Sequence, residues 1–125
     1  MNTHRSAEDY LEMILILSKK QDYVKSIDIS NALKFSRPSV SVAMKNLKKL
    51  NLINISPSNA IELTTEGKII AKKILKRHRT ISDALVNIGV PRDIAEKDAC
   101  KIEHDISTES FQAICKHLNC ENKEV

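Results

Sequence analysis

Apolar residues recur every three or four positions along most of the chain, which is the spacing of one face of a helix. This pattern predicts helices over residues 7–19, 27–33, 37–50, 65–88, 92–105 and 108–118. Residues 53–63 differ, because Ile53-Asn54-Ile55 alternates, four turn-forming residues follow, and Ile61-Glu62-Leu63 returns. The sequence therefore predicts a mainly α protein with one small β-hairpin.

The ends of these helices carry recognisable signals. Gly89 is placed to end the long helix, and Pro91 precedes the next one. Residues with side-chain oxygens stand before four helices and are predicted N-caps: Ser6, Ser26, Thr64 and Ser107.

Three helices followed by a hairpin is the order of a winged helix. The helices over 27–33 and 37–50 are separated by Lys34-Phe35-Ser36, a layout typical of a helix-turn-helix. No Asp or Glu occurs from Ile29 to Ile61, which points to a polyanionic partner, although a solvated Lys-rich face gives the same pattern. The residues expected to contact DNA are Ser36, Arg37, Pro38, Ser39, Ser41 and Lys45.

Composition narrows the class of protein. The 125 residues are 29% charged and 42% hydrophobic, as in globular proteins. No run approaches the ~18 uncharged apolar residues of a membrane span, and the N-terminus resembles no signal peptide, so we expect a cytoplasmic protein without a membrane partner. Three cysteines in a reducing compartment predict no disulfide; Cys115 and Cys120 are expected to be packing or surface thiols.

The helix over 92–105 combines three kinds of metal donor. Cys100, Glu103 and His104 stand at i, i+3 and i+4, so a thiol, a carboxylate and an imidazole share one helix face. The apolar residues Ala95, Ala99, Ile102 and Ile106 are expected on the opposite face. The alternative is a surface ion-pair network in which Lys97 and Lys101 pair with Glu103.

Two other helices have more apolar surface than one packed side requires. The first helix carries Met13 and Ile16 outside its main stripe, and Asp9 and Glu12 share that second face. The long helix has an apolar stripe that includes His78 among Ile70, Ile74, Ile81, Leu85 and Ile88. We therefore predict a homodimer formed through residues from about 70 to 118.

Several segments together resemble the metal-dependent repressors typified by the diphtheria toxin repressor and the manganese transport regulator. They are Ser6-Ala7-Glu8-Asp9-Tyr10-Leu11-Glu12, Ser36-Arg37-Pro38-Ser39-Val40, Leu63-Thr64-Thr65-Glu66-Gly67, Lys76-Arg77-His78-Arg79 and the run from Ala99 to Ser107. The resemblance implies a winged helix-turn-helix DNA-binding domain over 1–64 and a helical metal-binding and dimerisation domain over 65–125. It also implies a repressor of metal homeostasis that binds double-stranded operator DNA as a dimer when metal occupies a site between these domains.

The resemblance also implies the ligands. They are Asp9, Glu12, His78, Cys100, Glu103 and His104, with Glu96 as a possible extra ligand. Asp9 is similar to the manganese-type members and Cys100 to the iron-type members, so Mn(II) or Fe(II) is expected, with Zn(II) or Co(II) as alternatives. Ser82 stands where iron-type members have an ancillary carboxylate.

Two other functions compete with this interpretation. A winged-helix regulator that senses a small organic ligand or thiol oxidation would leave Asp9 and Glu12 unexplained. A metal-dependent hydrolase would need an open coordination position and a general base, and the sequence offers no second acid–base pair or Gly-rich loop. We therefore expect no enzyme activity.

Overall fold

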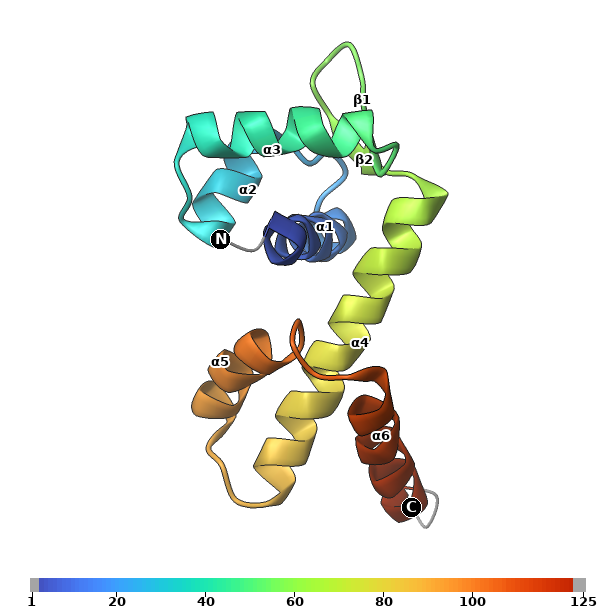
Figure 1. Ribbon diagram of the computed structural model, residues 1–125. Coiled ribbons are helices and arrows are strands. Elements are labelled where there is room, and N and C mark those ends of the chain that lie inside the picture. The colour runs from blue at the N-terminus through green and yellow to red at the C-terminus, as the bar shows by residue number, and fades with distance from the viewer. Residues whose placement is uncertain (1–2, 123–125) are drawn as a thin grey trace. The chain divides into compact units, whose positions relative to one another are not determined.

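The computed structural model describes the backbone of residues 3–122 and the side chains of residues 6–118. Two compact units divide the chain, Met1–Lys73 and Ile74–Val125, and the helix α4 (Thr65–Asn87) contributes residues to both (Figure 1). The predicted mainly α fold with a small hairpin wing is confirmed. No helix in the described part of the chain is long and apolar enough to cross a membrane.

The N-terminal unit has winged-helix order. Its elements are α1 (Thr3–Lys20), α2 (Ser26–Leu33), α3 (Arg37–Lys49), β1 (Ile53–Ile55) and β2 (Ile61–Leu63). The strands pair antiparallel with Asn54 opposite Glu62. The hairpin also gains a bridge that the sequence did not predict, because the Ile61 amide donates to the Val24 carbonyl at 2.7 Å. The wing is thereby attached to the loop before α2.

The core of this unit is aliphatic, with one aromatic contact in which Tyr10 meets Phe35 edge-on at 5.8 Å. The apolar spacing along residues 37–50 predicts that Val40, Met44, Leu47 and Leu50 pack together. This is confirmed for Val40, Met44 and Leu47, but Leu50 follows the last residue of α3 and is 62% exposed. The main buried residues are Leu11, Ile14, Leu15, Val24, Ile29, Val40, Met44, Leu47, Ile53 and Ile61.

Two of the four predicted N-caps are wrong. Because α1 begins at Thr3, Ser6 lies inside it, and because α2 begins at Ser26, the residue before it is Lys25. Asp28 performs the capping there, since its Oδ2 accepts a hydrogen bond from the Lys25 amide at 2.9 Å. Carboxylates near a helix N-terminus are stabilising in this way.

The start of α4 shows why Gly67 is glycine. The Thr64 hydroxyl caps α4 by accepting from the Gly67 amide at 3.1 Å, as predicted, and it donates to the Asn51 carbonyl at 2.7 Å. A Cβ at position 67 would lie 2.1 Å from the Leu52 carbonyl oxygen. Only a residue without a side chain fits this approach of helix to backbone.

The C-terminal unit contains the rest of α4, then α5 (Arg92–Ile102) and α6 (Thr108–Asn122). Gly89 has a φ of +110°, as expected of a residue ending a helix, and Ser107 caps α6 by accepting from the Ser110 amide at 3.1 Å. Ile88, the last residue of the apolar stripe predicted for the long helix, follows α4 and is 77% exposed. The last helix, predicted to end at Leu118, continues to Asn122 in α6; the residues beyond it and the side chain of Cys120 lie outside the described part.

Candidate metal centre and nucleic-acid interface

Three potential metal ligands meet where α4 passes the end of α5. His78 comes from α4, Cys100 from the last turn of α5, and Glu103 from the residue that follows α5. His78 Nδ1 lies 2.8 Å from Glu103 Oε1 and 3.8 Å from Cys100 Sγ. One donor atom from each residue lies within 4.8 Å of the others. These residues, singled out from the sequence on two separate segments, thus form one cluster.

The carboxylate of Glu103 is the buried member of this cluster. Its side chain is 0% exposed, while that of His78 is 17% exposed. Its Oε2 has no hydrogen-bond partner among the described residues, and His104 Nε2 lies 3.5 Å away. A buried carboxylate is costly unless it is paired or binds a cation. Glu103 therefore has one oxygen satisfied by His78 and a second that a cation would satisfy.

Helix α5 ends earlier than predicted, and this changes how its donors are arranged. The helix stops at Ile102, so Glu103 and His104 lie in the following turn. The expectation that all three donors face away from the apolar residues was wrong. Glu103 follows the buried Ala95 and Ala99 at intervals of four, which places it on their side of the helix. Cys100 is exposed, so the donors extend from the interior to the surface.

The neighbours of His78 change its protonation. Hydrogen bonds with Cys100 and with Glu103 raise the pKa of His78 from 6.5 to about 10, although its partial burial lowers it. The imidazole is therefore held as a cation beside the Glu103 carboxylate at neutral pH. A metal ion binds only the neutral imidazole and must displace this proton.

The donor set fits a divalent transition metal. Ligand atoms bound at ~2.0–2.3 Å to one ion lie roughly 3–4 Å apart, so a cluster whose donors lie within 4.8 Å needs only small side-chain movements. A carboxylate suits Mn(II), an imidazole suits Fe(II) and Zn(II), and a thiolate favours the softer ions. An ion at this position would take over the role of the His78 proton and would satisfy Glu103 Oε2.

Arg77 is a residue of this site that our sequence reasoning did not assign a role. It is 8% exposed, and its Nη1 donates to the carbonyl oxygens of Glu103 and Ile106, both at 3.2 Å. Its guanidinium also lies over the Phe111 ring at 5.2 Å from the centroid. Arg77 thus fixes the turn that carries Glu103 and His104. Its spacing from Ile74 and Ile81, which keeps a charged residue in the apolar stripe, was the available signal.

The other predicted metal residues are described within their own units. Asp9 and Glu12 are one turn apart on α1 in the N-terminal unit, half-buried and buried respectively. Glu96 is exposed on α5. Ser82 is buried and donates its hydroxyl to the Arg79 carbonyl at 3.1 Å. Cys115 is half-buried on α6, away from the cluster in sequence and outside its ligand set.

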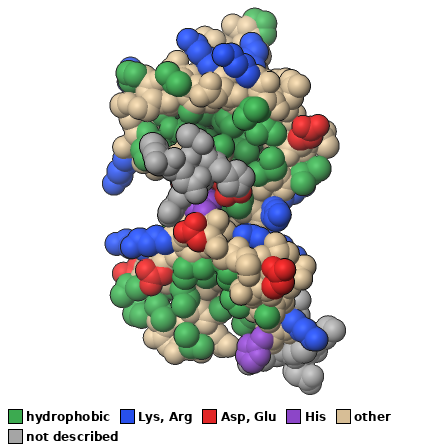
Figure 2. Space-filling model, in the orientation of Figure 1, with side chains coloured by type: hydrophobic (Ala, Val, Ile, Leu, Met, Phe, Trp, Pro, Cys, Tyr) green, Lys and Arg blue, Asp and Glu red, His purple; other side chains and the backbone are tan. Residues whose placement is uncertain are grey.

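The predicted DNA-contacting residues are all exposed, and they lie just before α3 or within its first three turns. Ser36 is partly engaged, because its hydroxyl caps α3 by accepting from the Ser39 amide at 3.3 Å. Arg37, Ser39, Ser41 and Lys45 remain on the surface. Figure 2 shows Lys and Arg side chains gathered at the top of the N-terminal unit, the region of α3 and the hairpin in Figure 1.

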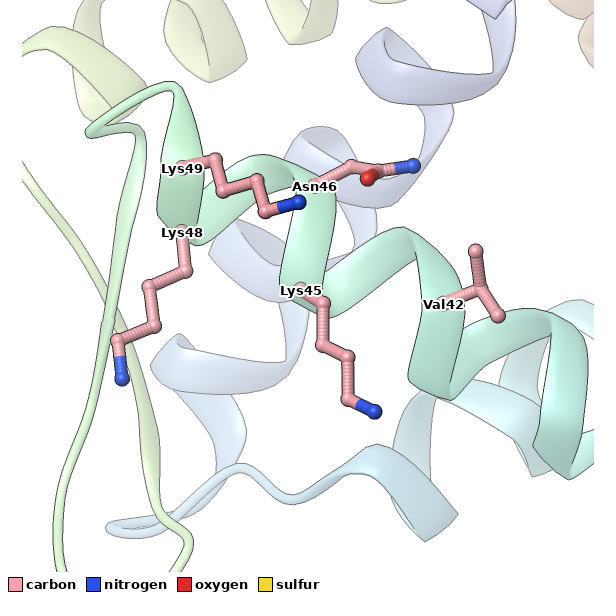
Figure 3. A pocket seen from close by; sticks show the side chains of 5 residues that line it. All are labelled: Val42, Lys45, Asn46, Lys48 and Lys49. Atoms are coloured by element: carbon pink, nitrogen blue, oxygen red, sulfur yellow. The ribbon is translucent and has the colours of Figure 1, made fainter.

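Our sequence reasoning did not name most of the exposed residues toward the C-terminal end of α3 as DNA contacts. A shallow hollow of about 470 Å³ is lined by Val42, Lys45, Asn46, Lys48 and Lys49, and all five side chains project from α3 (Figure 3). Only Lys45 had been predicted to contact DNA. The same helical spacing that selected Ser41 and Lys45 could have selected Val42 and Lys49, because they lie on the side opposite the buried stripe.

Two sequence families match this chain over nearly its whole length. Residues 2–61 match the iron dependent repressor N-terminal DNA binding domain. Residues 64–122 match the iron dependent repressor metal binding and dimerisation domain. The two matches thus follow the same order as the winged helix and the helical unit with the donor cluster.

Individual relatives agree with these matches. The chain is 32% identical to the transcriptional regulator MntR of Escherichia coli over 85% of its own length and 68% of that protein. It is 35% identical to an uncharacterized HTH-type transcriptional regulator of Methanocaldococcus jannaschii over 88% of its own length and 90% of that protein.

A solved manganese-dependent transcriptional repressor in complex with manganese has a similar fold. It matches 90% of this chain with a TM-score of 0.84 and 27% identity, and the match covers 52% of that structure. The chain spans about half the length of the solved structures that it matches in this way.

Proposed function

This chain belongs to the iron-dependent repressor family, and we propose on that premise that it represses transcription by binding operator DNA when it holds a divalent metal ion. The observation that carries the proposal is the cluster of His78, Cys100 and Glu103, in which the buried Glu103 Oε2 accepts no hydrogen bond from the described residues. A plain structural ion pair between His78 and Glu103 would not explain why a thiol and a second imidazole also lie beside this pair.

The proposed ligand set extends beyond this cluster. His104 is included because its imidazole is 1% exposed and lies 3.5 Å from Glu103 Oε2. Asp9 and Glu12 are included because they occupy the family's ligand positions on α1, and Glu96 is kept as a possible extra ligand. With ligands on α1 as well as on α4 and α5, metal affinity and DNA affinity become coupled, so that each raises the other.

The metal is proposed to be Mn(II) or Fe(II). The similar solved structure described as a manganese-dependent repressor is consistent with the first, and the thiol of Cys100 favours the second, or Zn(II) or Co(II). Mn(II) would be bound mainly through the carboxylates, whereas the softer ions would also depend on the thiolate. Replacing Cys100 therefore distinguishes Mn(II) from the softer ions.

The remaining parts of the proposal concern assembly. The DNA-binding domain is proposed to comprise residues 1–64 and the metal-binding and dimerisation domain residues 65–125. Two copies would bind a two-fold symmetric operator. The protein is proposed to act in the cytoplasm on metal-uptake genes and to have no enzyme activity, as expected of a regulator that recognises DNA rather than converting a substrate.

The test is DNA binding at fixed ionic strength with and without metal. Duplexes are selected from a random library by protein loaded with Mn(II), Fe(II), Co(II) or Zn(II), and affinities are then measured by fluorescence anisotropy. Fixed salt is essential because phosphate contacts make affinity depend steeply on ionic strength. We expect at least a fivefold gain in affinity from one of these ions, as for coupling of about 1–3 kcal/mol.

Matched variants assign the effect to the cluster. His78→Ala and Glu103→Ala are expected to abolish the gain, whereas His117→Ala, which changes an exposed histidine on α6, should keep it. Cys100→Ser is compared with Cys115→Ser to separate a ligand from an ordinary thiol. Equal DNA affinity with every ion and without metal would rule out the proposed function. Loss of DNA binding on oxidation of Cys100, without any metal effect, would favour a thiol-based regulator instead.

A further inference from the structure

Val42 is an apolar residue placed where a structural role gives no reason for one. It lies on α3 and is 59% exposed. Each helical residue turns about 100°, so Val42 lies roughly 200° from Val40 and from Met44, on the side opposite the buried stripe. Valine is also a weaker helix former than most residues at exposed positions. The exposed part of the side chain therefore contributes little to the core or to the stability of the helix.

The surroundings of Val42 identify a partner of definite chemistry. Lys45, Lys48 and Lys49 line the same hollow of about 470 Å³ (Figure 3). No acidic residue occurs from Ile29 to Ile61, which includes all of α3 and the hairpin turn. A partner that fits is strongly anionic but presents at least one apolar group toward the helix. Double-stranded DNA meets both conditions in its major groove.

We propose that Val42 contacts the 5-methyl group of a thymine and so determines one base of the operator. The thymine methyl is the only apolar group that base edges display in the major groove. A valine side chain neither donates nor accepts a hydrogen bond, so it discriminates through this group alone. Lys45, Lys48 and Lys49 contact phosphates, which position the helix but carry no sequence information. This inference rests on the proposed function only in needing duplex DNA as the partner.

The test removes the methyl group without changing base pairing. Each thymine of the duplex selected by the Mn(II)-loaded protein is replaced in turn by uracil, which lacks only the 5-methyl group. At one thymine per half-site we expect affinity to fall about fourfold, as for one methyl group returned to water. With Val42→Ala, thymine and uracil at that position should bind equally, while other positions should behave as in the native protein.

Two control variants separate base reading from general effects. Leu50→Ala removes another exposed apolar side chain of the same region, at the far end of α3, and should keep the native thymine preference. Lys45→Ala should weaken binding to thymine and uracil duplexes alike and reduce the salt dependence by about one phosphate contact.

The outcomes distinguish this inference from the proposed function. If DNA is selected equally well with and without metal, the metal-dependent function fails, but the uracil comparison still decides the role of Val42. If binding requires metal and no uracil substitution is sensitive to Val42→Ala, the inference is overturned and the proposed function stands. If no duplex is selected under any condition, both are overturned.

Discussion

A proton and a metal ion compete for the imidazole of His78. Its pKa is raised to about 10 by hydrogen bonds with Cys100 and Glu103, so the metal-free protein carries the proton at neutral pH. We predict that Mn(II) binding near pH 7.5 releases about one proton from this imidazole and that affinity falls about tenfold per pH unit below about pH 10. Calorimetric titration in two buffers of different ionisation enthalpy measures the release.

The metal-free protein should show the opposite dependence on pH. A folded pKa of about 10, above the ordinary 6.5, means that the His78 ion pair contributes its full stability below about pH 6.5 and loses it as pH rises toward 10. His78→Ala should abolish this trend, and His117→Ala should not. Proton release that is unchanged in His78→Ala would show that His78 is not the residue from which the metal displaces a proton.

Arg77 offers a test of how the turn after α5 is held. We predict that Arg77→Met lowers metal affinity about 10–100-fold, because the carbonyls of Glu103 and Ile106 lose their donor and the ligands on this turn lose their fixed positions. Arg77→Lys keeps the charge but not the planar guanidinium group. Its metal affinity should therefore lie between those of the native protein and of Arg77→Met. Competition with a metal chelator measures the affinities. Arg79→Met, at the exposed neighbouring position, should bind metal as the native protein does.

Sequence alone identified the residues of the cluster better than their surroundings. His78 was recognisable because an imidazole is rare in an apolar stripe, and Cys100 and Glu103 because two kinds of donor stand at helical spacing. The burial of Glu103 and the role of Arg77 could not be predicted, because both depend on where α5 ends and how the following turn meets α4. These are tertiary contacts between residues 25 or more positions apart, such as Arg77 with Glu103.

At the scale of elements, the periodic pattern predicted the six helices and the hairpin, and the main errors were at their ends. Helix α1 begins before Ser6, α5 stops at Ile102, and α6 continues past Leu118. The error at α1 arose because Ser6, a polar residue suitable as a cap, was taken as the boundary. Capping oxygens are common, and the alternative partner, such as the Asp28 carboxylate at α2, became evident only with the backbone positions known.

Gly67 gives a prediction at this scale. Gly67→Ala places a methyl group against the Leu52 carbonyl oxygen, which the backbone cannot easily move away from the start of α4. We expect the free energy of unfolding to fall by about 1–3 kcal/mol, as for overpacking elsewhere. Urea denaturation followed by circular dichroism measures it. Alanine normally stabilises a helix relative to glycine, so an unchanged or raised stability would show that this contact relaxes without cost.

At the scale of the whole molecule, the proposed dimer would explain why the C-terminal unit has exposed apolar residues. Ile88 is 77% exposed and Ile94 is 47% exposed, on either side of the loop that joins α4 to α5. An exposed isoleucine alone is ordinary, but two at one loop in a chain matched to a dimerisation domain suggest a surface covered by a second copy.

We predict that Ile88→Lys and Ile94→Lys together convert the metal-loaded protein from dimer to monomer in sedimentation velocity. Each copy then carries two new charges, so a symmetric interface would have to bury four. Affinity for the selected duplex should then fall at least tenfold, since the second recognition helix no longer binds with the effective concentration that the dimer provides. Ile69→Lys is a suitable control: Ile69 is 63% exposed and lies on α4 in the N-terminal unit, outside the residues expected to form the dimer. If the double variant remains a dimer, the interface lies on another part of the C-terminal unit, and the loop between α4 and α5 faces solvent in the assembled repressor.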